Sequence, residues 1–328
     1  MGILALAPFI LGAWLANYGD VHKSIRFFSL AVLGLINFML LSSGLLLLSV
    51  ESLMSVSDVP LPPDMPAINF FDVGLAIAIT GIFAWIPLIP PARRAIARLI
   101  PIRPDSVVHI TALCYSIYLA GSTLATWPII DVIAENEALA EQTFGQLGLT
   151  DAWLTGLVFA LMAVFGVGLF VKRTGREALV RLKIEGLNGR QIGEVIGAVT
   201  VLLIIELGIT QIWQALDPDG IERVGGLTDS FISPFLSPAG ALTVGLAAGI
   251  GEELLFRGAL QPRFGIILTT LIFTIAHAQY SLSPALIAIF IVGYALGIIR
   301  NRVNTTAAIL VHAGFNFLQV IGATYLGG

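Results

Sequence analysis

The sequence has few charged residues. Asp, Glu, Lys and Arg make up only 12% of its 328 residues, whereas soluble domains carry about 25%. Hydrophobic residues make up 57% of the chain, and its mean hydropathy is +0.92. This balance excludes an ordinary soluble globular protein and predicts an all-α fold, a polytopic bundle of transmembrane helices.

Cysteine and histidine are also scarce. The single cysteine, Cys114, excludes an intramolecular disulfide, and its apolar surroundings predict a buried structural thiol. No serine or cysteine nucleophile motif is evident, and the HExxH helix of the standard zinc proteases is missing. Of only four histidines, His22 and His109 lie beside predicted helix ends, where we expect no catalytic role.

Long apolar runs are abundant. A spanning helix needs about 20 apolar residues, and the chain offers ten candidate segments. The first has no Lys or Arg before it and no clear cleavage site after it, so we interpret it as a membrane helix and not a signal peptide. The segments are approximately Gly2–Leu15, Phe27–Val50, Phe70–Leu88, Val107–Ile133, Trp153–Val171, Ile192–Trp213, Ala239–Leu260, Phe264–Ala278, Pro284–Ile299 and Thr305–Leu326.

The distribution of basic residues among the loops supports this count of segments. When successive loops are assigned to alternate sides of the membrane, every Lys and Arg except Arg223 falls on one side. Because basic residues collect on the cytoplasmic side, the segregation predicts about ten helices with both termini outside. Within the basic side, residues 173–190 are predicted to form an interfacial helix.

Polar residues at membrane depth gather in the last four segments. We therefore divide the chain into an N-terminal transmembrane region of about six helices, residues 1–234, and a second region of about four helices, residues 235–328, which carries the candidate functional residues. A charged side chain at the centre of a bilayer costs about 2.5–3.5 kcal/mol of insertion free energy, and such residues usually have a functional role. The polar groups of the second region therefore mark its function.

The seventh segment carries Glu252, Glu253 and Arg257. Glu253 and Arg257 are four residues apart, so they share a helix face and can pair. Glu252 lies about 100° round the helix from Glu253 and stays free for chemistry. A purely structural alternative is a buried ion pair beside one protonated glutamate.

Two further pairs follow on later segments. Phe273 and His277 share one face of the eighth segment, where the phenyl ring can pack against the imidazole. His312 and Asn316 share one face of the tenth and project together into the bundle. Taken singly, each pair is compatible with a structural histidine or with a hydrogen bond between helices.

Together these groups can build a hydrolytic site. A glutamate in an apolar pocket is a good base near neutral pH, and with a histidine it can hold and deprotonate a water. A second histidine and an amide can donate hydrogen bonds to the oxyanion of a tetrahedral intermediate.

The three motifs in this order resemble those of the CAAX protease and bacteriocin-processing (CPBP, or Abi) family of intramembrane endopeptidases, which includes the Ras-converting prenyl proteases. The motifs are Glu252-Glu253-x-x-x-Arg257, Phe273-x-x-x-His277 and His312-x-x-x-Asn316. Gly258 and the stretch Gly293-x-x-x-Gly297-x-x-Arg300 also match. The resemblance covers roughly residues 235–325.

The resemblance implies a role for each motif residue. Glu252 and His277 activate the water, Glu253 and Arg257 support the site, and His312 and Asn316 stabilise the oxyanion. It also implies a glutamate-type reaction without a cofactor. A zinc ion remains an alternative, with Glu252, His277 and His312 as ligands.

The expected substrate is a membrane-embedded or lipidated peptide or protein, for example a prenylated one, and no nucleic acid is expected. Arg257 lies near the cytoplasmic end of its segment, so the site is expected to face the cytoplasm of a prokaryotic cell membrane. Two other functions stay open. Intramembrane Glu and His residues, with Glu206, could form the proton path of a transporter, or the chain could be a non-proteolytic immunity or scaffold protein.

Overall fold

The computed structural model describes residues 7–57 and 68–326, and every extended regular element among them is a helix, which confirms the predicted all-α class. The longer helices are α1 (Ala7–Gly19), α2 (Lys23–Ser57), α3 (Phe70–Phe83), α5 (Val107–Ala134), α7 (Leu149–Gly166), α9 (Gly189–Leu216), α11 (Pro238–Glu253), α12 (Gln261–Ile275), α13 (Ala285–Arg302) and α14 (Thr305–Leu326). The shorter ones are α4 (Pro90–Ile96), α6 (Glu137–Phe144), α8 (Gly175–Leu182) and α10 (Pro218–Ile232), with 3-10 turns η2 (Ile86–Leu88), η3 (Ser233–Phe235) and η5 (Ala278–Tyr280). A π-helix, η4 (Leu254–Leu260), joins α11 to α12.

Polar caps set where several of these helices begin. The Ser237 hydroxyl accepts the Gly240 N–H at 3.0 Å, and Pro238 occupies the first turn of α11. Thr174 and Glu177 form a reciprocal capping box at the start of α8. Lys183, in the left-handed conformation, ends α8 after Leu182, so the predicted interfacial helix over residues 173–190 is much shorter than expected.

Each of the ten predicted segments contains a helix, but eight stretches of the described chain are long and apolar enough to cross a membrane. The first segment yields α1, whose 13 residues are too few; residues 2–6 of that segment lie outside the described part. The seventh and eighth segments form one helical run over residues 238–275. The protein is thus an integral membrane protein, and the sidedness of its termini stays a prediction.

The run over residues 238–275 reverses its direction at Gly265. This residue has φ +76°, which glycine adopts without a steric penalty. The rings of Phe256 and Phe273 lie 5.3 Å apart between centroids, whereas residues 17 apart in a straight helix are separated by about 25 Å. The chain after Gly265 therefore folds back along the π-helix, and this return brings the second motif beside the first.

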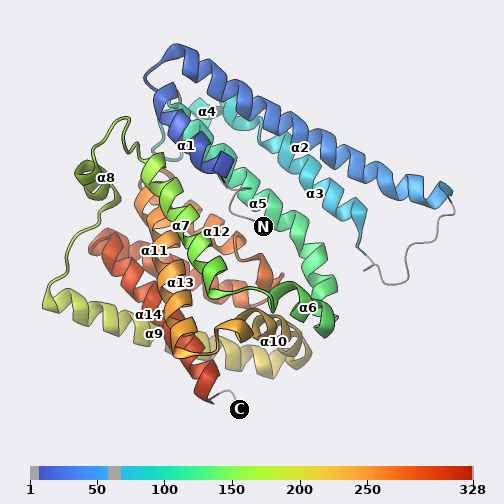
Figure 1. Ribbon diagram of the computed structural model, residues 1–328, viewed down its shortest axis with the longest axis vertical. Coiled ribbons are helices and arrows are strands. Elements are labelled where there is room, and N and C mark those ends of the chain that lie inside the picture. The colour runs from blue at the N-terminus through green and yellow to red at the C-terminus, as the bar shows by residue number, and fades with distance from the viewer. Residues whose placement is uncertain (1–6, 58–67, 327–328) are drawn as a thin grey trace.

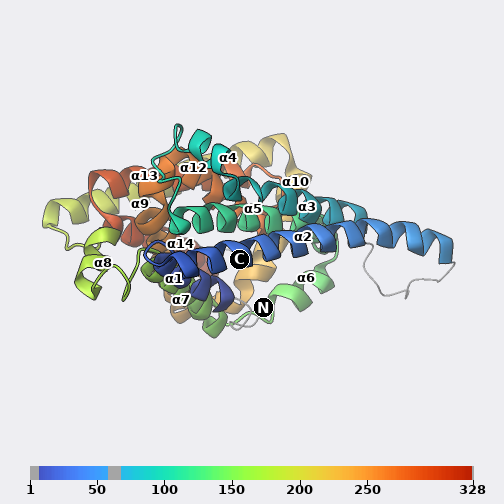
Figure 2. The same ribbon diagram turned by 90° about the horizontal axis from the view of Figure 1, so that it is seen from above.

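The helices form a bundle with α11 inside it. Figures 1 and 2 show α2 and α3 side by side along one edge of the molecule, with α5 next to them. Helix α11 packs between α7 and α14, and α9 covers α14 and α13 from the other side. Helices from the N-terminal region therefore contact the helices that carry all three motifs.

Glycines allow α11 to approach its neighbours closely. A Cβ atom at Gly245 would lie 2.6 Å from the carbonyl oxygen of Ala313 on α14, and one at Gly251 would lie 2.5 Å from that of Gly156 on α7. Both separations are shorter than real Cβ contacts. This close contact brings the end of α11 within side-chain reach of α14.

Gly245→Ala is expected to destabilise the protein, because its new Cβ meets backbone that cannot move aside. The cost should be about 1–3 kcal/mol, typical of overpacking, and a thermal-unfolding scan of the detergent-purified protein would measure it. Gly208→Ala is the matched control, since a Cβ on this α9 residue has nothing within 4 Å. Equal midpoints for the two variants would show that the contact between α11 and α14 is looser than the structure indicates.

Candidate active site

A cavity of about 430 Å³ lies among α7, α9, α10, α11, α13 and α14. Four of the six predicted site residues line it, namely Glu252, His277, His312 and Asn316. They come from α11, the end of α12 and α14, so side chains as far apart in sequence as Glu252 and Asn316 face one space. The remaining wall is mostly apolar and includes Phe159, Phe231 and Val292.

The other two predicted residues, Glu253 and Arg257, are fully buried and do not line this cavity. Arg257 Nε lies 3.3 Å from Glu253 Oε2, which confirms the expected pairing of these side chains on one helix face. The adjacent glutamates therefore differ in environment. Glu253 is held in an ion pair, whereas the Oε2 atom of Glu252 is buried with no hydrogen-bond partner among the described residues.

Arg257 is held by more than its carboxylate. Its Nη2 donates to the carbonyl oxygen of Gly293 on α13 at 2.9 Å, and its guanidinium carbon lies 4.3 Å from the centroid of the Phe273 ring. A Cβ at Gly293 would come within 3.3 Å of that nitrogen and 2.9 Å of Phe273. Glycine at this position therefore lets the α13 backbone reach the arginine.

Gln261, the first residue of α12, makes a similar contact with the backbone of α13. Gln261 Nε2 donates to the carbonyl oxygen of Gly297 at 2.9 Å and to Asn301 Oδ1 at 3.0 Å. The carbonyl groups of Gly293 and Gly297, one helical turn apart on α13, thus each accept a hydrogen bond from a side chain of a preceding helix. The second of these side chains, Gln261, was not singled out from the sequence.

Glu253 also contacts the third motif. Its Oε1 lies 3.0 Å from His312 Nδ1, and both side chains are buried. A carboxylate only accepts, so His312 carries a proton on Nδ1 and directs it to Glu253. Glu253 therefore links Arg257 on the π-helix to His312 on α14, a contact that the sequence did not predict.

His277 is oriented by its own helix. Its Nδ1 lies 2.8 Å from the carbonyl oxygen of Phe273, which can only accept, so the proton resides on Nδ1 and Nε2 is left as an acceptor. The Phe273 ring lies 4.7 Å from the imidazole centroid, as predicted, and 6.0 Å from that of His312. One phenyl ring thus contacts both histidines and the arginine.

The first motif spans a change of helix type. Helix α11 ends at Glu253, and Arg257 lies in the π-helix that follows. π-Helical turns are rare and are found frequently at functional sites. This local geometry has no signal in the residues themselves, since Leu, Phe, Gly and Ala are compatible with an ordinary helix.

The zinc alternative stays a prediction, with Glu252, His277 and His312 as its ligands. Among the described residues, no three His, Cys, Asp or Glu side chains lie together in an arrangement that could hold a metal ion. The alternative ligand set of Glu252, His277 and His312 is thus not assembled as a metal site.

Six more polar residues line the cavity, among them Glu206, Tyr280 and Gln319. Gln319 lies three residues after Asn316 and seven after His312, so helical spacing alone would have placed it on the same face. Tyr280 lies in η5, outside the predicted segments. Glu206 was considered only as part of a proton path, and its position on α9 shows that the N-terminal region contributes to this wall.

The fold and this cavity define an α-helical integral membrane protein with a polar site assembled by its last helices. Residues 234–318 match the family model described as Rce1-like, type II CAAX prenyl endopeptidase Rce1-like. The match confirms the resemblance to the CAAX protease and CPBP family over this part of the chain, about a quarter of its length. Comparisons with curated proteins and with solved structures gave no match.

The two glutamates are expected to differ in their effect on stability. Glu253→Gln leaves Arg257 buried without its carboxylate, and loss of one partner of a buried pair costs about 3–5 kcal/mol. Glu252→Gln removes no contact that the described structure shows and should leave the unfolding midpoint nearly unchanged. Thermal unfolding in detergent measures both, and a larger loss for Glu252→Gln would contradict this division.

Proposed function

We propose that the protein is an intramembrane endopeptidase of the CAAX type, in which Glu252 and His277 activate a water. One observation carries the proposal: side chains of all three motifs converge on one cavity inside a membrane protein. The match of residues 234–318 to a family of endopeptidases supports the reaction class. The match names no transporter, so it does not favour the proton-path alternative.

In the proposed reaction, Glu252 accepts a proton from water while the water oxygen attacks the carbonyl carbon of the peptide bond. The unpartnered carboxylate oxygen of Glu252 and the free Nε2 of His277 are the two acceptors available for that water. The proton then passes to the nitrogen of the leaving amine as the C–N bond breaks, which restores the glutamate.

The oxyanion that forms on the carbonyl oxygen needs hydrogen-bond donors. The Asn316 amide can donate in every protonation state. His312 can donate from Nε2 only when both of its nitrogens are protonated, because Nδ1 already serves Glu253. We infer that Glu253 supports this state through its negative charge, and that Arg257 fixes the carboxylate that does so.

The lining of the cavity supports a proposal for the class of substrate. Phe159, Phe231 and Val292 give the cavity an apolar lining that suits a membrane-embedded peptide or a lipidated one. Basic residues lie in the first turn of α12 (Arg263) and in the last turn of α13 (Arg300 and Arg302), and they favour access from the cytoplasmic side. We therefore propose a prenylated or transmembrane segment cut near the cytoplasmic surface.

Glu252→Gln and His277→Ala should each reduce cleavage at least about 100-fold, since general acid–base groups contribute about 10²–10⁴-fold. A fluorescence-quenched farnesylated peptide in proteoliposomes, beside a transmembrane peptide, provides the measurement. Glu194→Gln and His22→Ala are matched controls, because both residues are exposed and away from the cavity. If Glu252→Gln cleaved the peptide at the same rate as the unmutated protein, the proposal would be wrong.

The proposed reaction uses no metal, so prolonged treatment with EDTA or 1,10-phenanthroline should leave the cleavage rate unchanged. Loss of activity that added Zn²⁺ restores would replace the water-activation scheme with a zinc reaction. The peptidase assignment would survive that result, because the same assay would still show cleavage.

A further inference from the structure

A second cavity, of about 570 Å³, lies among α1, α2, α5, α7 and the π-helix. Most of its wall is apolar, with Phe9, Ile36, Leu40, Leu119 and Met162 among the lining side chains. On α5 the lining residues recur at helical spacing from Val108 to Ser122, a rise of about 21 Å. The space is therefore long enough to follow one leaflet of a bilayer, whose half-thickness is about 15 Å.

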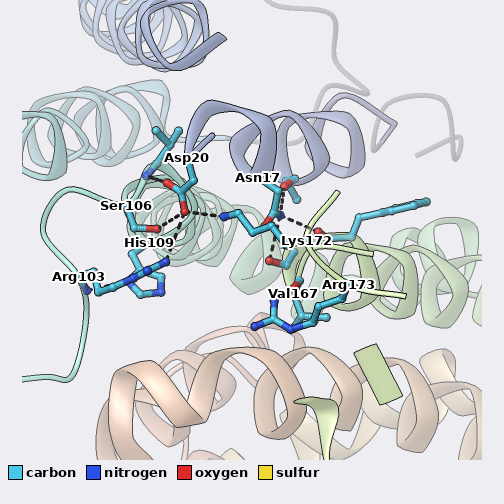
Figure 3. A network of polar contacts seen from close by, with 12 residues as sticks. Asn17, Asp20, Arg103, Ser106, His109, Val167, Lys172 and Arg173 are labelled. Atoms are coloured by element: carbon cyan, nitrogen blue, oxygen red, sulfur yellow. Dashed lines mark hydrogen bonds and ion pairs between the residues drawn. The ribbon is translucent and has the colours of Figure 1, made fainter. Parts of the chain in front are cut away.

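One end of this cavity is strongly basic. Five cationic side chains line it together with a single carboxylate, that of Asp20. Figure 3 shows Asp20 with three of them, Arg103, Lys172 and Arg173. The five cationic side chains come from different parts of the chain: the segment before α5, the segment after α7, α8 and the turn within α12. These residues are Arg103, Lys172, Arg173, Arg181 and Arg263.

Asp20 accounts for only two of these cations. Its carboxylate accepts from Lys172 Nζ at 2.7 Å and lies 3.6 Å from Arg103 Nη2, with a further bond from the Ser106 hydroxyl at 2.8 Å. Burial alone would raise the pKa of Asp20, but these donors outweigh it and lower the pKa. The Asp20 carboxylate is therefore already occupied by Lys172, Arg103 and Ser106 and leaves the other cations of the cluster without a carboxylate.

The remaining three arginines have no carboxylate partner in the part of the chain that the structure describes. Arg173 donates to the carbonyl oxygen of Val167, and Arg181 donates to those of Gly258 at 3.0 Å and Ala259 at 3.4 Å. Burial, together with the nearby positive charges of Arg263 and Arg173, lowers the pKa of Arg181 to about 10. The cluster thus carries excess positive charge that no described side chain balances.

We propose that this second cavity binds an anionic phospholipid, with the phosphate at the basic end and an acyl chain along α5. A phosphate diester supplies the negative charge that the arginines lack, and arginine is suited to bind phosphate through two parallel hydrogen bonds. The apolar length beyond the cluster excludes a small anion as the sole occupant of the space. The basic end lies where positive residues meet anionic headgroups in membrane proteins.

The position of Arg181 decides which residues can test the site. Its guanidinium holds two carbonyl groups of the π-helix that carries Arg257, so replacing it would disturb the candidate active site. Arg263 lines the basic end and makes no hydrogen bond within the described structure. Ser116 lines the apolar part, and its hydroxyl bonds only to the carbonyl of Ala112 in its own helix. Arg263→Gln and Ser116→Phe are therefore the informative variants.

The test measures lipid binding to the delipidated full-length protein by native mass spectrometry and by thermal shift in detergent. Phosphatidylglycerol should bind and raise the unfolding midpoint, whereas phosphatidylcholine and glycerol 3-phosphate should bind at least about fivefold more weakly. Arg263→Gln should weaken phosphatidylglycerol binding about fivefold, the usual effect of one basic residue near an anionic headgroup. Ser116→Phe should weaken it by filling the chain's path.

Arg94→Gln and Thr126→Phe are the matched controls, because both residues are exposed and neither lines the cavity. Equal binding of phosphatidylcholine and phosphatidylglycerol would overturn the proposal, as would binding of glycerol 3-phosphate as tight as that of the lipid. Unchanged binding by folded Arg263→Gln and Ser116→Phe would overturn it too. Elution of each variant as a single peak in size-exclusion chromatography confirms that it is folded.

Discussion

The buried pair of Glu253 and Arg257 is the constraint on which the rest of the site depends. Two ions removed from water are stable only when each finds close partners, because the desolvation penalty exceeds their attraction otherwise. The structure meets this demand from several helices: α13 offers the Gly293 carbonyl, Phe273 lies under the guanidinium, and His312 reaches the carboxylate. The last helices thus all contact this one ion pair. Gly245 allows α11 to come close to α14, and Gly293 allows the α13 backbone to come close to Arg257.

This constraint separates the functions of neighbouring residues. Glu253 is used by Arg257 and His312, so it has no freedom to act on a substrate. Glu252 lies one position earlier, faces the cavity and keeps a carboxylate oxygen without a partner. The two histidines have different partners, since a backbone carbonyl orients His277 and a buried carboxylate orients His312. One glutamate of the first motif is thus held by the protein and the other faces the cavity, whereas both histidines line the cavity with Nδ1 already bonded.

Helical spacing and membrane composition predicted the class of fold, the pairing of Glu253 with Arg257 and the contact of Phe273 with His277, because these depend on residues within one turn. Contacts that depend on how helices approach each other were not predictable from spacing. The bond between Glu253 and His312, the carbonyl of Gly293 at Arg257 and the lining residue Tyr280 are of this kind. Among the described residues, eight stretches are long and apolar enough to cross a membrane, because the seventh and eighth of the ten predicted segments form one helical run that turns at Gly265.

The π-helix lines the second cavity and carries Arg257, which pairs with Glu253 beside the candidate active site. On one side, Arg257 extends from it toward Glu253 and the motif residues; on the other, its carbonyl groups at Gly258 and Ala259 accept from Arg181 of the basic cluster. Its Phe256 lines the second cavity and packs edge-on against Phe273, which contacts both histidines. A charge bound near Arg181 therefore acts on the same short helix that positions Arg257. The N-terminal helices, which contribute most of the second cavity, are connected to the candidate active site through this helix and directly through α7, whose Phe159 lines both cavities.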